Sequence, residues 1–223
     1  MTDLAIFDLD YTLTRRGTWG RFVWKNLRYR PQRWLPFLCA TVKAQLQYKS
    51  GKTSRVFVKQ EMMRWSMVGA RKEDIIRMAE EFADKEIEQG LRPGAWRALE
   101  SHRVKGDTIV IASAAVCVIV DAIARRLDVE HWVATEMKWE DGRLAPDFAS
   151  ENCYGPQKLE RVKRLIDNNP ALKHNHTHIT MYSDSYSDIE ILRFCDKGVA
   201  VNADRRLAKV SGEEGFDRVN WSY

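Results

Sequence analysis

The chain has 223 residues, of which 44% are hydrophobic and 30% charged, a balance that is ordinary for a globular protein and argues against a disordered chain. Three acids and no base among the first ten residues argue against a secretory signal, and the longest apolar run, residues 109–120, is too short to span a bilayer. The 4 cysteines are scattered without a C-x-x-C pair, so we expect a cytoplasmic protein with reduced thiols rather than a disulfide framework or a zinc site.

The net charge of +5 is unevenly distributed along the chain. Residues 11–60 carry twelve Lys and Arg and no Asp or Glu, whereas residues 61–223 carry 24 bases and 28 acids. Such a block either contacts an anionic partner or is only solvated. In the second case the aliphatic parts of the Lys and Arg side chains cover apolar surface while their charged ends stay in water. Because tryptophans alternate with its cations, residues 15–60 could contact an anionic membrane surface. Nucleic acid is an unlikely partner, since no motif that reads it accompanies the charge.

The predicted elements begin with residues 4–7, an apolar run that leads directly into Asp8, as in a buried parallel strand with an acid at its carboxyl end. The next block, residues 15–90, has mostly helical apolar spacing, with breaks at Pro31, Pro36, Ser50–Gly51 and Gly69. Further apolar runs predict strands at residues 108–112, 178–182 and 198–202, with a weaker one at 132–138. Helical patterns separate these strands, at residues 95–104, 116–127, 157–167 and 189–194.

This alternation predicts the α/β class, with a doubly wound, Rossmann-like parallel sheet and right-handed crossovers. The helical residues 15–90 interrupt the alternation, so we expect a helical cap inserted into a core that is built from residues 1–14 and 91–223. Residues 167–178 are the most irregular stretch, and we expect a loop there. Three alternating histidines could bind a metal, although no acids or cysteines accompany them: His174, His176 and His178.

Polar side chains follow the predicted strands at their carboxyl ends, which is where ligands bind in an open α/β sheet. In chain order they are Asp8, Asp10, Ser113, Lys158, Asp184 and Asp188. Two carboxylates two residues apart can act as a nucleophile and a proton shuttle. A carboxylate can approach an anionic phosphate ester only where cations cancel the repulsion, and a lysine together with Mg²⁺ would do this.

These residues resemble the four motifs of the haloacid dehalogenase-like (HAD) phosphatases. The first motif, D-x-D-x-T, is Asp8-Leu9-Asp10-Tyr11-Thr12, and the second is Ser113 after an apolar run. The third is Lys158, and the fourth is the D-x-x-x-D pair of Asp184 and Asp188. A lone D-x-D-x-T is a weak signal, whereas all four motifs in order over residues 4–202 are a strong one. Their spacing leaves room for a cap after the first motif, as in the phosphoserine-phosphatase-like subfamily IB.

The resemblance implies a role for each of these residues. Asp8 would attack phosphorus to form a phospho-aspartate, and Asp10 would protonate the leaving oxygen and then activate the hydrolytic water. The implied phosphate-binding residues are Thr12, Ser113 and Lys158. The implied ligands of Mg²⁺ are Asp8, the backbone carbonyl of Asp10, and Asp184, with Asp188 supporting the metal. Each residue also has a plainer interpretation, because aspartate and serine commonly cap helices and most lysines are solvated.

One departure from the phosphoserine phosphatases bears on the substrate. Where those enzymes hold the substrate amine with a glutamate, this chain has Gly17, and residues 11–60 contain no carboxylate at all. We therefore expect a phosphomonoesterase for a small or amphiphilic phosphate ester that does not favour phosphoserine. Some relatives act on lysophosphatidate-like lipids, so a lipid-phosphate phosphatase at the inner face of a membrane is an alternative. A phosphotransferase and an anionic-surface binding module remain alternatives too, and no feature of the sequence specifies an oligomeric state.

Overall fold

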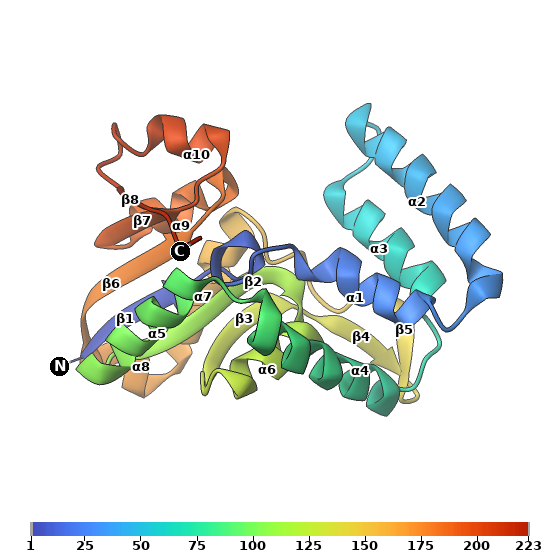
Figure 1. Ribbon diagram of the computed structural model, residues 1–223, viewed down its shortest axis with the longest axis horizontal. Coiled ribbons are helices and arrows are strands. Elements are labelled where there is room, and N and C mark those ends of the chain that lie inside the picture. Colours follow the sequence, from blue (N-terminus) through green and yellow to red (C-terminus); the bar gives the residue numbers. More distant parts are fainter. Residues whose placement is uncertain (1, 223) are drawn as a thin grey trace.

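A six-stranded sheet forms the centre of the computed structural model, which describes residues 2–222 except for the side chains of residues 174–177 (Figure 1). Every neighbouring pair of its strands is parallel, as the alternating pattern predicts. From one edge to the other the strands are β3 (His131–Thr135), β2 (Thr108–Val116), β1 (Thr2–Phe7), β6 (His176–Ser183), β7 (Lys197–Val201) and β8 (Asp217–Val219).

The strand order reverses at β1, which lies between β2 and β6. Phe7, the last residue of β1, pairs with Ile111 in β2 and with Tyr182 in β6. The residues that follow these partners therefore meet at the carboxyl edge of the sheet, at the point where open α/β sheets bind ligands. This register brings the first, second and fourth motifs together although they are far apart in the sequence.

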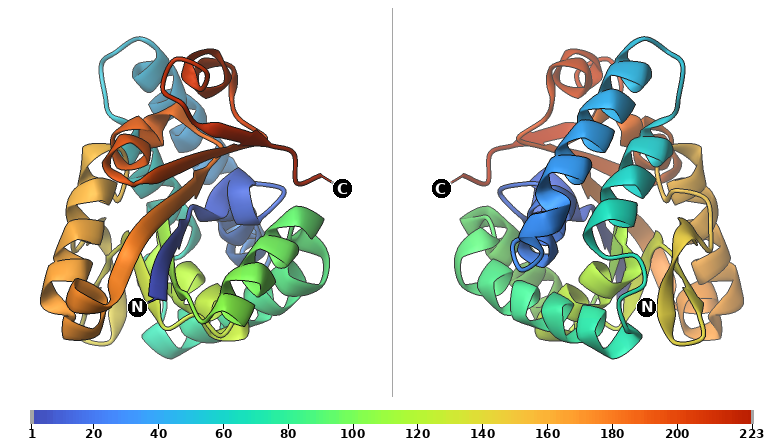
Figure 2. Two further views of the ribbon diagram at one scale, coloured as in Figure 1. Left: turned by 90° about the vertical axis from the view of Figure 1, so that its left-hand side faces the viewer. Right: turned by 90° about the vertical axis from the view of Figure 1, so that its right-hand side faces the viewer.

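Helices cover both faces of the sheet, because alternate residues of a strand point to opposite sides. Ala5 and Phe7 belong to the hydrophobic cluster that includes α5 (Pro93–Lys105) and α6 (Cys117–Arg126). Leu4 and Ile6 belong to the cluster on the other face. That cluster includes α7 (Pro156–Asn168), α8 (Pro170–Asn175), α9 (Ile189–Phe194) and α10 (Arg205–Val210). Figure 2 shows the two layers from the sides.

The segment 15–90 forms α1 (Thr18–Leu27), α2 (Trp34–Lys49), α3 (Arg55–Ser66) and α4 (Lys72–Lys85). Of these, α4 packs against α6, whereas α2 and α3 stand out beside the sheet (Figure 1). The chain enters and leaves the segment side by side, since Thr14 forms an antiparallel bridge with Leu91. The hairpin of β4 (Met137–Glu140) and β5 (Arg143–Phe148) supports α3, and the amide of Gly69 donates to the carbonyl of Leu144 (2.9 Å). The division into a core and a cap stays a prediction.

Several local predictions differ from the structure. Pro36 does not break a helix, because it lies in the first turn of α2, where a backbone N–H has no partner in the helix to lose. The stretch at 132–138 divides into β3 and β4, and the expected loop at 167–178 contains α8 and the start of β6. The sequence analysis did not predict β5, β8 or α10: β8 has only 3 residues, and Pro146 inside β5 argues against a strand. No helix in the described part of the chain is both long and apolar enough to cross a membrane.

Candidate active site

A cavity of about 510 Å³ opens at the carboxyl edge of β1. Six of the seven site residues predicted from the sequence line it: Asp8, Asp10, Ser113, Lys158, Asp184 and Asp188. The helices of segment 15–90 form the opposite wall with Trp19, Gln45, Tyr48, Arg55, Lys59 and Met62. The four motifs therefore meet in one cavity, and the segment 15–90 contributes cations and aromatic rings to it but no acid.

Lys158 connects two of the predicted carboxylates at the base of this cavity. Its Nζ donates to Oδ1 of Asp8 (2.8 Å) and to Oδ2 of Asp188 (2.7 Å), and all three side chains are buried. Burial alone would lower the pKa of Lys158, but the charges of Asp188 and Asp8 outweigh it and raise the pKa above the usual lysine value. The hydroxyl of Ser183 also donates to Oδ2 of Asp188 (2.7 Å), which fixes that carboxylate further. Lys158 is therefore a permanent cation in the cavity.

The turn at Leu9–Leu13 positions the carboxylates that follow β1. Its backbone is irregular, and Tyr11 adopts a positive φ of 63°. Asp10 lies in this turn. Its Oδ1 accepts a hydrogen bond from the amide of Thr18 (2.8 Å), at the start of α1. Burial raises the pKa of Asp10, and the bond from Thr18 partly opposes this. A carboxyl group with a raised pKa can hold a proton for transfer to a leaving group.

Thr12 is fully buried and lies behind the carboxylates rather than in the cavity wall. Its hydroxyl accepts a bond from the amide of Asp184 (2.9 Å) and lies 3.1 Å from Oδ1 of Asp184 and 3.5 Å from Oδ2 of Asp8. The single hydroxyl proton is thus directed at these carboxylates. The structure gives Thr12 a role in holding Asp184 against the first motif, and its contact with a phosphoryl group stays a prediction.

Ser113 and Asp184 occupy the other two strand ends. The Ser113 hydroxyl accepts a bond from the amide of Ala115 (3.0 Å), which orients the side chain in the irregular end of β2. Burial raises the pKa of Asp184 to about 6; the bond from Thr12 lowers it and the nearby charge of Asp188 raises it again. Burial and the same neighbouring carboxylates also raise the pKa of Asp8, although Lys158 opposes them.

The donors around Asp8 fit a divalent cation. Asp8 and Asp188 share the ammonium of Lys158, and Asp184 adds a third carboxylate close enough to raise the pKa of Asp8, so the carboxylates outnumber the cation that is bonded to them. Oδ1 of Asp188 is buried and has no hydrogen-bond partner among the described residues. Among the side chains that the structure describes, which leave out those of residues 174–177, no group of three His, Cys, Asp or Glu is spaced to hold a metal. The predicted set needs only two carboxylates, because its third ligand is the backbone carbonyl of Asp10.

Residues 5–193 of the chain match the sequence model of one protein family, the haloacid dehalogenase-like hydrolases. The chain belongs to this family. Among curated HAD relatives, a phosphoserine phosphatase of Mycobacterium tuberculosis is 26% identical over 220 residues, which cover 97% of this chain and 70% of the relative. A histidinol-phosphatase of Neisseria meningitidis is 24% identical over 231 residues, covering 99% of this chain and 100% of the relative.

Solved structures show the same fold. A protein of unknown function from Bordetella pertussis superimposes with a TM-score of 0.84 at 21% identity, covering 98% of this chain and 99% of that one. This structure confirms the predicted fold. The family match and the curated relatives confirm the predicted HAD type, which is phosphoserine-phosphatase-like, and identify the protein as a HAD-type phosphatase.

Lys59 reaches from α3 into the active-site cavity and was not predicted from the sequence. Its Nζ donates to the carbonyl of Ala114 (2.6 Å) and to Oδ1 of Asn152 (3.2 Å). The ammonium also lies 5.6 Å from the ring centre of Trp19 and 5.0 Å from that of Phe148. Burial lowers the pKa of Lys59 to about 7. The spacing of Arg55, Lys59 and Met62 places all three on one helical face, but only the packing reveals that this face meets the core.

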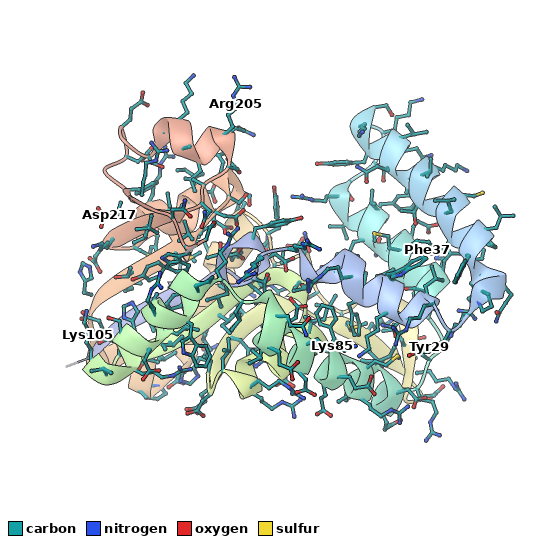
Figure 3. The ribbon with its side chains drawn as sticks, in the orientation of Figure 1. Tyr29, Phe37, Lys85, Lys105, Arg205 and Asp217 are labelled. Atoms are coloured by element: carbon teal, nitrogen blue, oxygen red, sulfur yellow. The ribbon has the colours of Figure 1, made fainter. Side chains whose placement is uncertain are left out.

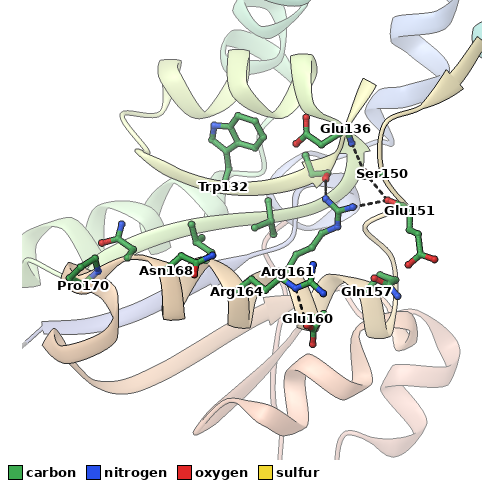
Figure 4. A pocket seen from close by; sticks show the side chains of 14 residues that line it. Trp132, Glu136, Ser150, Glu151, Gln157, Glu160, Arg161, Arg164, Asn168 and Pro170 are labelled. Atoms are coloured by element: carbon green, nitrogen blue, oxygen red, sulfur yellow. Dashed lines mark hydrogen bonds and ion pairs between the residues drawn. The ribbon is translucent and has the colours of Figure 1, made fainter. Parts of the chain in front are cut away.

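A larger hollow of about 850 Å³ lies away from these residues, between β3 and α7 (Figure 4). No residue predicted from the four motifs lines it. Arg161 uses two of its nitrogens there to bind the carbonyls of Ala134 (2.8 Å) and Glu151 (2.9 Å), so its charge supports the backbone. The side chains of His174 and His176 lie outside the described residues. Nδ1 of His178, in β6, lies 3.8 Å from Oδ2 of Asp196.

Proposed function

We propose that this HAD-type phosphatase hydrolyses phosphate monoesters through a phospho-aspartate on Asp8. The observation that carries the proposal is the bond from Lys158 to Asp8 inside a cavity that also contains Asp10 and Ser113. A buried ammonium beside the carboxylate lowers the cost of bringing a phosphate anion to it. Asp8 then forms the new bond to phosphorus while the bond to the ester oxygen breaks.

Asp10 is the residue that we propose to move the proton. Its raised pKa supports donation of a proton to the departing alcohol, and the resulting carboxylate can then take a proton from water. That water attacks the phosphorus of the acyl phosphate, which releases inorganic phosphate and restores Asp8. Ser113 and Lys158 would hold the phosphoryl oxygens throughout.

We also propose a Mg²⁺ requirement. Asp8, Asp184 and the backbone carbonyl of Asp10 would hold the ion, with Asp188 beside it. When bound, Mg²⁺ would offset the charge of the carboxylates and of the phosphoryl group. The excess of carboxylates over cations around Lys158 supports this requirement.

The cavity wall from segment 15–90, which we propose to be the cap, bears on the substrate. A Cβ atom on Gly17 would lie 3.3 Å from the ring of Tyr11, so this ring occupies the space next to the position where phosphoserine phosphatases carry a glutamate. The cap residues that line the cavity include Arg55 and Lys59 and no acid. An ammonium group on a substrate would find no counter-charge on this wall, which disfavours phosphoserine and equally histidinol phosphate. The proposed substrate is a small or amphiphilic phosphate ester.

A lipid phosphate such as lysophosphatidate is the second candidate, with residues 15–60 facing the anionic inner surface of a membrane. The observation that favours it is the exposed apolar side of α2, where Leu35, Leu38 and Leu46 are all more than half exposed. Four free cysteines, three of them buried, support a reducing, cytoplasmic location. Transfer of the phosphoryl group to an alcohol instead of water would use the same Asp8 chemistry.

The deciding experiment compares Asp8→Asn with a matched surface variant, Asp167→Asn. We expect Asp8→Asn to lower kcat for an aryl phosphate by about 10⁴-fold or more, because the amide is a poor nucleophile, and Asp167→Asn to change nothing. EDTA should abolish the activity and Mg²⁺ should restore it. Full activity of Asp8→Asn, or of the EDTA-treated enzyme, would refute the mechanism.

The substrate is then identified by phosphate release from serine phosphate, histidinol phosphate, sugar phosphates, glycerol phosphate, nucleotides and lysophosphatidate. We expect poor hydrolysis of the two amine-bearing esters. A strong preference for serine phosphate would overturn the argument from Gly17. Stimulation by added alcohols, with phosphorylated alcohol as product, would identify a phosphotransferase, and anion binding without any turnover would identify a binding module.

A further inference from the structure

The outward side of α2 carries a stripe of apolar side chains that nothing in the described chain covers. Leu35, Leu38, Val42 and Leu46 are 71%, 58%, 48% and 62% exposed. Their spacing places them within one narrow strip along the helix, since residues three, four, seven and eleven apart share a face. Ala44 is the only buried residue of this helix. Isolated exposed leucines are ordinary, but a continuous strip on one helix marks a contact surface.

The opposite side of α2 accounts for the packing of this helix within the protein. Phe37 lies on the side that faces α3 (Figure 3), and it packs against the main hydrophobic cluster. Tyr48, eleven residues after Phe37, shares this side and lines the active-site cavity, whereas Gln45, seven residues after Leu38, reaches the cavity from the edge of the stripe. The stripe is therefore an additional apolar surface rather than the inner face of the cap.

Aromatic side chains extend the stripe at the amino-terminal end of α2. Trp24 and Trp34 lie 5.5 Å apart between ring centres and are 53% and 43% exposed, and Tyr29 is 66% exposed. The indole Nε1 of Trp34 donates to the carbonyl of Leu27 (3.0 Å), which holds the ring in place at the surface. Tryptophan and tyrosine are the residues that concentrate where a protein meets the polar headgroup region of a bilayer.

The charges around the stripe select the partner. Lys43 and Lys49 lie on α2 itself, and Arg28 is exposed beside Tyr29. Among the twelve cations of residues 11–60, Arg21 and Lys25 are the only two that form an ion pair with an acid of the described chain. The exposed cations near the stripe, such as Arg28, Lys43 and Lys49, have no acidic partner among the described residues, and an anionic lipid surface would attract them. A second copy of the same face would bring cation against cation, which disfavours a symmetric dimer.

We propose that the α2 stripe, defined as Leu35, Leu38, Val42 and Leu46 with Trp34, docks the protein on an anionic membrane surface. The apolar side chains enter the boundary between headgroups and acyl chains, while Lys43 and Lys49 contact the headgroup phosphates. This docking does not depend on the proposed hydrolysis. Because Tyr48 of the same helix lines the cavity, docking brings the active site close to lipid headgroups. Hydrolysis of a lipid phosphate at the membrane would follow only if the proposed function also holds.

Co-sedimentation of the full chain with vesicles tests the proposal. The vesicles are phosphatidylcholine alone and phosphatidylcholine mixed with phosphatidylglycerol, at low and high salt. We expect binding to the anionic vesicles that weakens with salt, and little binding to the neutral ones. The triple variant Leu35→Gln, Leu38→Gln, Leu46→Gln should bind at least about tenfold more weakly. Lys43→Gln with Lys49→Gln should reduce the salt dependence, and Val104→Gln, an exposed apolar residue on α5, should have no effect.

Hydrolysis of a soluble aryl phosphate separates this proposal from the proposed function. The triple variant should keep the wild-type rate, which verifies that it is folded. No sedimentation of the wild type with anionic vesicles at low salt would overturn the docking surface, as would equal binding of the triple variant. A wild-type dimer in sedimentation velocity that the triple variant dissociates would assign the stripe to a second copy instead. None of these results depends on whether Asp8 is the nucleophile.

Discussion

Replacing Lys59 with methionine should change the pH dependence of stability, and the size of this change follows from the burial of the ammonium. Burial lowers the pKa of Lys59 to about 7, whereas an unfolded chain holds a lysine near 10.5. Above pH 7 the unfolded state therefore binds more protons than the folded state. The sign follows from this difference: the free energy of unfolding rises with pH in this range, and Lys59 destabilises the protein most at neutral and lower pH.

The magnitude comes from the fraction of folded protein that loses the proton. Between pH 7 and pH 9, a lysine that titrates near 7 when folded adds about 2 kcal/mol to the free energy of unfolding. Because a folded-state pKa about one unit higher would give the smaller value, roughly 1–2 kcal/mol is the expected range of this change. For a chain of this size, this corresponds to a rise of roughly 2–8 °C in Tm.

The assay is urea unfolding of the wild type and of Lys59→Met at pH 7 and pH 9. Lost bonds to Ala114 and Asn152 change the stability of the variant by an amount that is nearly constant with pH, so they cancel from the comparison between the two pH values. Lys105→Met, at an exposed lysine on α5 (Figure 3), is the matched control and should follow the wild type. If the difference between wild type and Lys59→Met is the same at both pH values, the ammonium is hydrated and the reasoning is wrong.

Three further outcomes are expected from the active site. Lys158→Met should lower the free energy of unfolding by about 3–5 kcal/mol, because Asp8 and Asp188 then lose their buried counter-ion, and urea unfolding measures this loss. Thr12→Val should raise the Mg²⁺ concentration that gives half-maximal activity about tenfold, because Asp184 loses the hydroxyl that holds it. A Mg²⁺ titration of the rate would detect this, and the loss of stability should be smaller than that of Lys158→Met. Lowering the pH through about 6 should raise the Mg²⁺ concentration that gives half-maximal activity, because Asp184 gains a proton there and a protonated carboxyl is a poor ligand. An Mg²⁺ requirement that is constant from pH 5 to pH 8 would contradict this assignment.

The residues at the carboxyl ends of the strands were predictable because local sequence carries their signal. Asp8 follows an apolar run, Ser113 follows another, and the acids at 184 and 188 follow a third. Parallel pairing brings such positions to one edge of a sheet, so the pattern of strands is enough to predict that these residues meet. The prediction placed Ser113 just beyond a strand, whereas it lies inside the irregular end of β2.

The wall of the cavity that residues 15–90 form could not be predicted in the same way. Lys59 and Arg55 are two of twelve cations in residues 11–60, and periodicity alone does not distinguish the face of α3 that meets the core from the face that meets water. Thr12 belongs to a motif, yet its bonds to Asp184 depend on the turn at Leu9–Leu13, whose irregular backbone no propensity scale predicts.

The order of apolar runs and polar residues was sufficient to establish the α/β class, the HAD motifs and the excess of positive charge in residues 11–60. These are properties of neighbouring residues, which local backbone preferences and hydrophobic periodicity express directly. The exposed stripe on α2, the buried ammonium of Lys59 and the ring of Tyr11 beside Gly17 depended on how helices pack against one another and against the sheet. Packing joins residues that are distant in sequence, and only the folded chain determines which of them water no longer reaches.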